Sequence, residues 1–202
     1  MKYKIGTRDF LQRARKRLDE NNPESIIYAA LELRLGIEAR LHKYMDVIED
    51  LPKKKSKGWR ISDLDKNLEN TFRKGNHIVE IMIIEETTHK PLALFYYTPV
   101  SKELVKKGEK IGELLHAKKI YQTQQDDWFL KTKQFLEEVY IEVENANKGT
   151  LLGPPLYNPS IGRFDITIEY FDGYNPKEIT ERIGVLGKRI LMNVAYPEKY
   201  PN

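Results

Sequence analysis

Apolar residues recur every three or four positions over most of the chain, which is the spacing of amphipathic α-helices. The longest stripe runs from Ile27 through Ile37 and Leu41 to Ile48. Its width predicts a central helix that packs against several neighbours. The same periodicity predicts helices over residues 7–20, 24–50, 62–74, 100–118, 124–147 and 176–193.

Three segments follow a different pattern. Residues 77–84 and 92–98 are rich in β-branched and aromatic residues and flank a turn at 87–91, which predicts a β-hairpin. Residues 163–171 alternate apolar with polar side chains, as a half-exposed strand does. We therefore expect an α+β fold, in which a bundle of five to six helices accompanies a small three-stranded antiparallel sheet of undetermined order.

Local signals mark several helix ends. Thr7, Ser62 and Ser101 stand where N-cap residues are expected, and Pro23 suits the first turn of the second helix. Gly108 and Gly112 lie on the inward face of the helix predicted over 100–118, where each costs about 1 kcal/mol of helix stability. Close approach of another backbone would explain both glycines, and simple tolerance is the alternative.

The chain has 202 residues, of which 40% are hydrophobic, so we expect one α+β domain over residues 1–202. Glycine and proline make 148–162 an irregular connection, and 195–202 is expected to be an extended tail.

Three compositional features narrow the classes of protein. The absence of cysteine excludes disulfides and thiolate chemistry. No apolar run follows the first residues, and the longest apolar stretch, Ile81–Ile84, is too short for a bilayer. A cytoplasmic protein without a membrane partner is the expectation.

Charge is segregated along the chain although the net charge is only +4. Residues 1–20 and 53–60 are basic, whereas residues 137–144 are acidic. Basic clusters attract phosphate backbones and other anions, but they also serve as solvated faces of an ordinary surface. The most concentrated cluster, a candidate ligand-binding segment, contains Lys53, Lys54, Lys55, Lys57, Trp59 and Arg60.

Polar residues interrupt the apolar stripe of the central helix. Arg34 lies within that stripe, Glu38 follows one turn later, and His42 lies at its margin. Long charged side chains are rarely buried unless they are paired, so we expect Arg34 to be mostly buried and paired with Glu38. His116 could approach them if the helices over 24–50 and 100–118 pack antiparallel.

The four residues Arg34, Glu38, His42 and His116 are the candidate catalytic residues. They admit a functional and a structural interpretation: an anion and proton-transfer site, or a buried ion pair with incidental histidines. The four histidines of the chain are scattered without metal-ligand spacing, and no phosphate-binding or nucleophile motif occurs, so no metal and no cofactor are expected.

Two segments carry a family resemblance: Ala29–His42, which reads AALELRLGIEARLH, and Ile111–Ala117, which reads IGELLHA and precedes a tryptophan-containing helix. Both resemble small prokaryotic HEPN-like proteins, and the likeness covers about residues 24–147. Active members of that superfamily cleave RNA at a dimer interface. They share an arginine and a histidine that are separated by four to six residues.

Here seven residues separate Arg34 from His42, and three separate Arg73 from His77, so the motif is not matched. The resemblance therefore implies a HEPN-like protein that is not an enzyme and that binds RNA, a nucleotide or another anion. Many such proteins belong to prokaryotic defence or mobile-element systems. Two alternatives remain: an assembly protein that forms homo-oligomers, most simply a dimer, through apolar helices, and an RNase-type phosphodiesterase.

Overall fold

A computed structural model describes residues 5–46, 60–72, 77–116, 126–153, 156–158, 163–165 and 189–200. The chain divides into two compact units. The first combines residues 1–76 with 100–147 and contains the helices, and the second combines 77–99 with 148–202 and contains the strands. The described residues form five helices and a three-stranded antiparallel sheet, which confirms the mixed α+β class.

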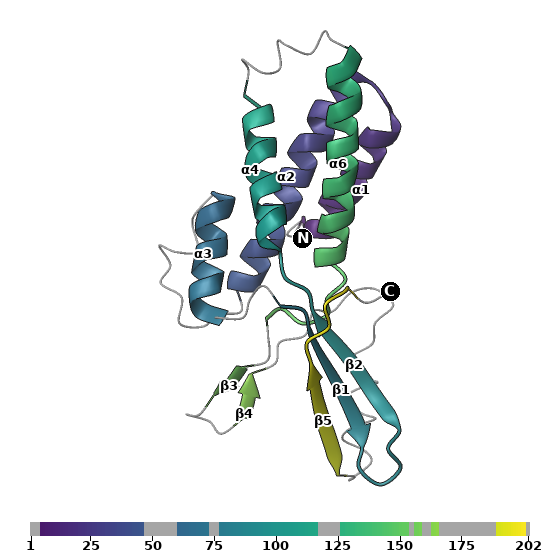
Figure 1. Cartoon of the computed structure of the whole chain (residues 1–202), viewed down its shortest axis with the longest axis vertical. Coiled ribbons are helices and arrows are strands. Elements are labelled where there is room, and N and C mark those ends of the chain that lie inside the picture. Colours follow the sequence, from purple (N-terminus) through teal and green to yellow (C-terminus); the bar gives the residue numbers. More distant parts are fainter. Residues whose placement is uncertain are drawn as a thin grey trace. The chain divides into compact units, whose positions relative to one another are not determined.

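Helix α2 is the element around which the helical unit is built. It packs against each of the other four described helices, and Ala30, Leu33, Ile37 and Leu41 are fully or almost fully buried along it. This confirms the central helix that the wide stripe predicts. The bounds of the helices are α1 Thr7–Asp19, α2 Pro23–Met45, α3 Ile61–Phe72, α4 Lys102–Leu114 and α6 Asp126–Ala146 (Figure 1).

The helix starts are only partly as expected. Ser101 caps α4, since its side chain accepts a hydrogen bond from the Leu104 N–H at 3.0 Å, and Pro23 occupies the first turn of α2. Thr7 and Ser62, by contrast, are not N-caps, because each lies inside its helix. The Ser62 N–H instead donates to the Glu109 carboxylate of α4 at 3.1 Å. A partner from another helix replaces the local cap.

The sheet has the strand order β2-β1-β5, with β1 Val79–Glu85, β2 Pro91–Tyr97 and β5 Ile190–Ala195. The antiparallel pairing of β1 with β2 confirms the hairpin, and its register places Ile81 opposite Phe95. On its other edge β1 pairs antiparallel with β5, where Ile81 is opposite Val194.

The prediction of the third strand is wrong. Of the segment 163–171 the structure describes residues 163–165, which form β4, Arg163–Asp165, and pair with β3, Leu156–Asn158, in a separate two-stranded sheet. Strand β3 therefore lies within the segment predicted as an irregular connection.

Strand β5 replaces it and occupies part of the segment 176–193 that was predicted to be helical, of which 176–188 lie outside the described residues. Ile190 continues a helical spacing from Ile183 and Leu186, but it also begins a short apolar run. Periodicity does not separate helix from strand in such a run, and pairing with β1 determines its conformation.

The turn between β1 and β2 contains a strained residue. His89 has a φ of 54°, in the left-handed region. Hydrogen bonds hold the turn around it: the Glu85 N–H donates to the Lys90 carbonyl at 2.9 Å, and the Thr88 hydroxyl donates to the Glu85 carboxylate at 2.6 Å. The turn thus fixes an unfavourable backbone conformation at a side chain that is exposed.

We expect His89→Gly to raise the free energy of unfolding by about 1 kcal/mol, because glycine adopts a positive φ without the steric cost that His89 pays. Urea unfolding of the full chain measures the change. Thr87→Gly in the same turn is the matched control and should be neutral or destabilising, because Thr87 does not have a positive φ. Equal effects of the two substitutions would contradict the assignment of strain to His89.

Candidate functional site

The centre of the candidate site is an ion pair on α2. Arg34 Nε lies 3.0 Å from Glu38 Oε1, and the two side chains are only 13% and 18% exposed. The Arg34 Nη1 also donates to the Gly108 carbonyl of α4 at 3.3 Å. The burial of Arg34 and its pairing with Glu38 are therefore as predicted, and the pair connects α2 with α4.

Glycine makes room for this contact on α4. A Cβ at Gly112 would overlap the Arg34 guanidinium, and one at Gly108 would lie 2.7 Å from Ile61 Cδ1 and 3.2 Å from Ile37 Cδ1. Real Cβ atoms essentially never come within 3.0 Å of a neighbour, so Arg34 or Ile61 would have to shift. Side chains of α2 and α3, and not another backbone as expected, therefore occupy the space that the two glycines leave on the inward face of α4.

Burial and charge act in opposite directions on the pKa of the Glu38 carboxyl. Burial raises the pKa of the Glu38 carboxyl, and the charge of Glu109 raises it as well, whereas Arg34 and His42 oppose the change. The net direction is upward, so desolvation outweighs the ion pair. His42 is half-buried one turn beyond Glu38 and belongs to the same polar group.

The fourth candidate, His116, does not join this group. It follows the end of α4 and is exposed, and within the described residues no hydrogen bond or ion pair connects it to Arg34, Glu38 or His42. The described structure thus brings three of the four candidate catalytic residues together on α2. Glu38 and His42 interact there through their charges, and the guanidinium is already held by Glu38 and Gly108.

The candidate ligand-binding segment is described only at its end. Lys53, Lys54, Lys55, Lys57 and Trp59 lie outside the described residues. Arg60 is exposed directly before α3, and its carbonyl accepts a hydrogen bond from the Asp63 N–H at 3.1 Å. Arg60 therefore marks the start of the helix.

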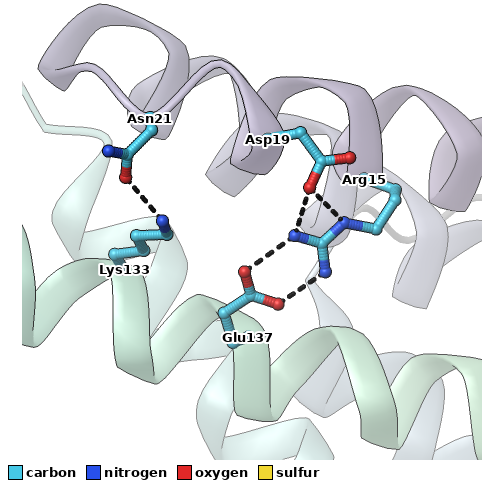
Figure 2. A network of polar contacts seen from close by, with 5 residues as sticks. All are labelled: Arg15, Asp19, Asn21, Lys133 and Glu137. Carbon is cyan, nitrogen blue, oxygen red and sulfur yellow. Dashed lines mark hydrogen bonds and ion pairs between the residues drawn. The ribbon is translucent and has the colours of Figure 1, made fainter.

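The basic and acidic clusters of the sequence meet within the helical unit. Arg15 of α1 binds Glu137 of α6 with both terminal nitrogens, at 2.6 and 2.8 Å, while its Nε donates to Asp19 (Figure 2). Figure 2 also shows Lys133 of α6 beside Asn21, just past the end of α1. These contacts stabilise α1 against α6 and compensate the charge of Arg15.

Two further pairs follow the same rule. Arg13 of α1 contacts both carboxylate oxygens of Glu32 on α2 at 2.9 Å. Lys107 of α4 donates to Glu142 of α6 at 2.6 Å, and this hydrogen bond raises the pKa of the lysine. Arg13 and Arg15 of the basic cluster, and Glu137 and Glu142 of the acidic cluster, thus form half-buried contacts between helices, which differ from the solvated face that was the alternative to anion binding.

Arg40 is the polar residue of α2 that sequence reasoning missed. It is fully buried, and its Nε donates to the Tyr44 hydroxyl at 2.9 Å and to the Ala146 carbonyl of α6 at 3.0 Å. The guanidinium also lies 4.6 Å from the centre of the Tyr44 ring. The available signal was its spacing, because Arg40 follows Gly36 and precedes Tyr44 by one turn each, and both are buried.

Comparisons with known proteins place no constraint on this site. No family model, no curated protein and no solved structure matches the chain. A metal site requires a group of at least three histidine, aspartate or glutamate side chains. The part of the chain that the structure describes contains no such group. None of the described helices is both long and apolar enough to cross a membrane.

We expect Gly112→Ala to destabilise the protein by about 1–3 kcal/mol, because the added Cβ displaces the Arg34 guanidinium. Gly36→Ala is the matched control: its Cβ would make ordinary contacts at 3.5 and 3.7 Å, so it should gain up to about 1 kcal/mol of helix propensity. In an Arg34→Ala background, Gly112→Ala should become neutral or stabilising. Additive effects of these two substitutions in urea unfolding would refute the contact.

The raised pKa of Glu38 predicts a pH dependence of stability. A folded pKa above the ordinary value of 4.5 stabilises the fold at low pH, and this contribution is lost as pH rises through the folded pKa. The free energy of unfolding of the parent, relative to Glu38→Gln, should therefore fall as the pH rises above the ordinary carboxyl pKa of 4.5. Arg34→Ala should steepen this fall because it removes an opposing charge. Parallel pH profiles of parent and Glu38→Gln would exclude the shift.

Proposed function

We propose that this chain is a non-catalytic, HEPN-like protein that binds RNA, a nucleotide or another anionic partner through the basic segment 53–60. The observation that supports the proposal is the composition of this segment, which has five cationic residues and no acidic one. An anion would meet its highest density of positive charge in that segment.

The composition of the segment suits a nucleic-acid backbone with exposed bases. Lysine binds phosphate as a flexible point charge, and each phosphate contact releases counterions. Trp59 offers an indole on which a base stacks, which is worth about 1–3 kcal/mol per base. RNA in single-stranded form presents both phosphate and unstacked bases, so it is the ligand with which we would begin.

The geometry of α2 favours binding over ribonuclease chemistry. A ribonuclease of the resembled kind needs an arginine that is available to a phosphate, and the Arg34 guanidinium is bound by Glu38 and by the Gly108 carbonyl. Exposed His116 is not connected to that pair within the described residues. These two observations support a protein that holds its ligand without cleaving it.

Replacing Lys53, Lys54 and Lys55 with alanine should weaken binding of single-stranded RNA. The slope of log K against log salt should flatten by about 2, because each neutralised phosphate contributes about 0.7. Fluorescence anisotropy titrations at several salt concentrations measure both quantities. The unfolding curve of the triple variant should match the parent, since only a charged segment has been altered.

A second triple variant, Lys16→Ala, Lys106→Ala and Lys131→Ala, is the matched control, because it removes three exposed lysines elsewhere. It should leave the slope nearly unchanged. Equal losses in the two triple variants would show that only net charge matters, and no binding by the parent would remove nucleic acid from the proposal. Release of shorter RNA fragments by the parent, absent in Arg34→Ala, would instead support the ribonuclease alternative.

A further inference from the structure

One side of α2 leaves apolar side chains in contact with solvent. Tyr28 and Leu31 are 48% and 41% exposed, and Leu35 is half-buried on the same side. The neighbouring helices define its two borders: Arg17 of α1 lies 5.4 Å from the Tyr28 ring, and Arg34 faces Gly112 of α4. We call this side, with Glu24, Tyr28, Leu31, Leu35, Glu38 and His42, the open face of α2.

The open face is symmetric in sequence about position 33. Leu31 and Leu35 stand at equal distances from that position, as do Tyr28 and Glu38, and as do Glu24 and His42. Glu24 and His42 are 18 residues apart, which is five full turns, so they lie on the same side of the helix. An identical helix that runs antiparallel across this face therefore places leucine opposite leucine at the centre. At each end it places an acidic residue opposite a tyrosine or a histidine.

We propose that the open face of α2 is an interface with a second copy of this chain, packed antiparallel about a twofold axis at position 33. In this arrangement Leu31 contacts the partner's Leu35. The Tyr28 hydroxyl donates a hydrogen bond to the partner's Glu38, and Glu24 lies opposite the partner's His42. Each contact occurs twice, as a twofold interface requires. The proposal does not depend on nucleic-acid binding.

Charge complementarity selects this face over the other exposed apolar stripe. On α6, Leu130 and Ile141 are 64% and 55% exposed. An antiparallel copy that brought Leu130 against the partner's Ile141 would also bring Asp127 against the partner's Glu144, and both of these acids are exposed. Asp127 is paired with Lys131 of its own helix at 2.5 Å, and no base of the partner lies opposite either acid, so that pairing lacks charge complementarity. The open face of α2 instead places an acid opposite a base at both ends.

The burial of Glu38 agrees with the same arrangement. Its carboxyl is largely removed from water and its pKa is raised, so an additional donor would be favourable there. The Tyr28 hydroxyl of a second copy would be such a donor. A stable interface buries about 1,000 Å² or more in total, and this requires the flanking surfaces of α1 and α4 to take part along with α2.

Sedimentation equilibrium of the full chain tests the interface. The parent should have twice the chain mass at about 10–100 µM, the range of a modest interface. Leu31→Glu should sediment as a monomer because it buries a charge at the centre. Leu130→Glu on α6 is the matched control and should leave the mass unchanged. A monomeric parent at these concentrations, or a dimer disrupted by Leu130→Glu and not by Leu31→Glu, would overturn the proposal.

Charge exchange tests the register. His42→Glu should weaken dimerisation about tenfold, since it places two acids opposite each other twice. Adding Glu24→Lys to that variant should restore the parent affinity. Failure of this restoration, while both variants unfold like the parent, would reject the antiparallel register.

Cross-linking gives a second measurement that does not rely on loss of association. The chain has no cysteine, so single cysteines can be introduced without background. A mixture of Leu31→Cys and Leu35→Cys proteins should form a disulfide-linked dimer under mild oxidation, because these positions oppose each other. A mixture of Leu130→Cys and Leu35→Cys proteins should not. Equal yields from the two mixtures would contradict the interface.

Discussion

Helix α2 packs on four neighbours although it carries two arginines among its buried positions. The packing of the helical unit depends on the groups that bind these two charges. A buried charge without a partner costs several kcal/mol, so each cation specifies what must lie opposite. Arg34 requires Glu38 and a carbonyl of α4, and Arg40 requires Tyr44 and the last residue of α6. These requirements fix where along α2 the helices α4 and α6 can pack.

The ion pairs between α1 and its neighbours specify in the same way where α1 packs. Arg13 selects Glu32 of α2, and Arg15 selects Glu137 of α6. Each half-buried pair contributes little by itself, but their positions agree with the burial of Leu11, Ala14 and Leu18 on the same helix. Hydrophobic burial supplies the stability, and the charges specify the register.

Features that depend on neighbours in sequence could be predicted, whereas those that depend on neighbours in space could not. The Arg34–Glu38 pair spans one turn, so the helical spacing was sufficient to predict it. The cap of α3 comes from Glu109 of α4, and strand β5 is determined by β1, so neither has a local signal. The position of His116 depends on where α4 ends. Arg40 had no such local signal for its contact with α6, since its partner there, the Ala146 carbonyl, is 106 residues away in the chain.

The pairing of β1 with β5 determines when the three-stranded sheet can form during synthesis. These strands are more than 100 residues apart, and helices α4 and α6 lie between them in the chain. The ribosome therefore completes both helices while the β1–β2 hairpin still lacks its third strand. A two-stranded hairpin is only marginally stable in water, and its unpaired edge exposes backbone groups that can join another chain. During synthesis, the time between the emergence of β1 and that of β5 is the period in which a chaperone would be of most use.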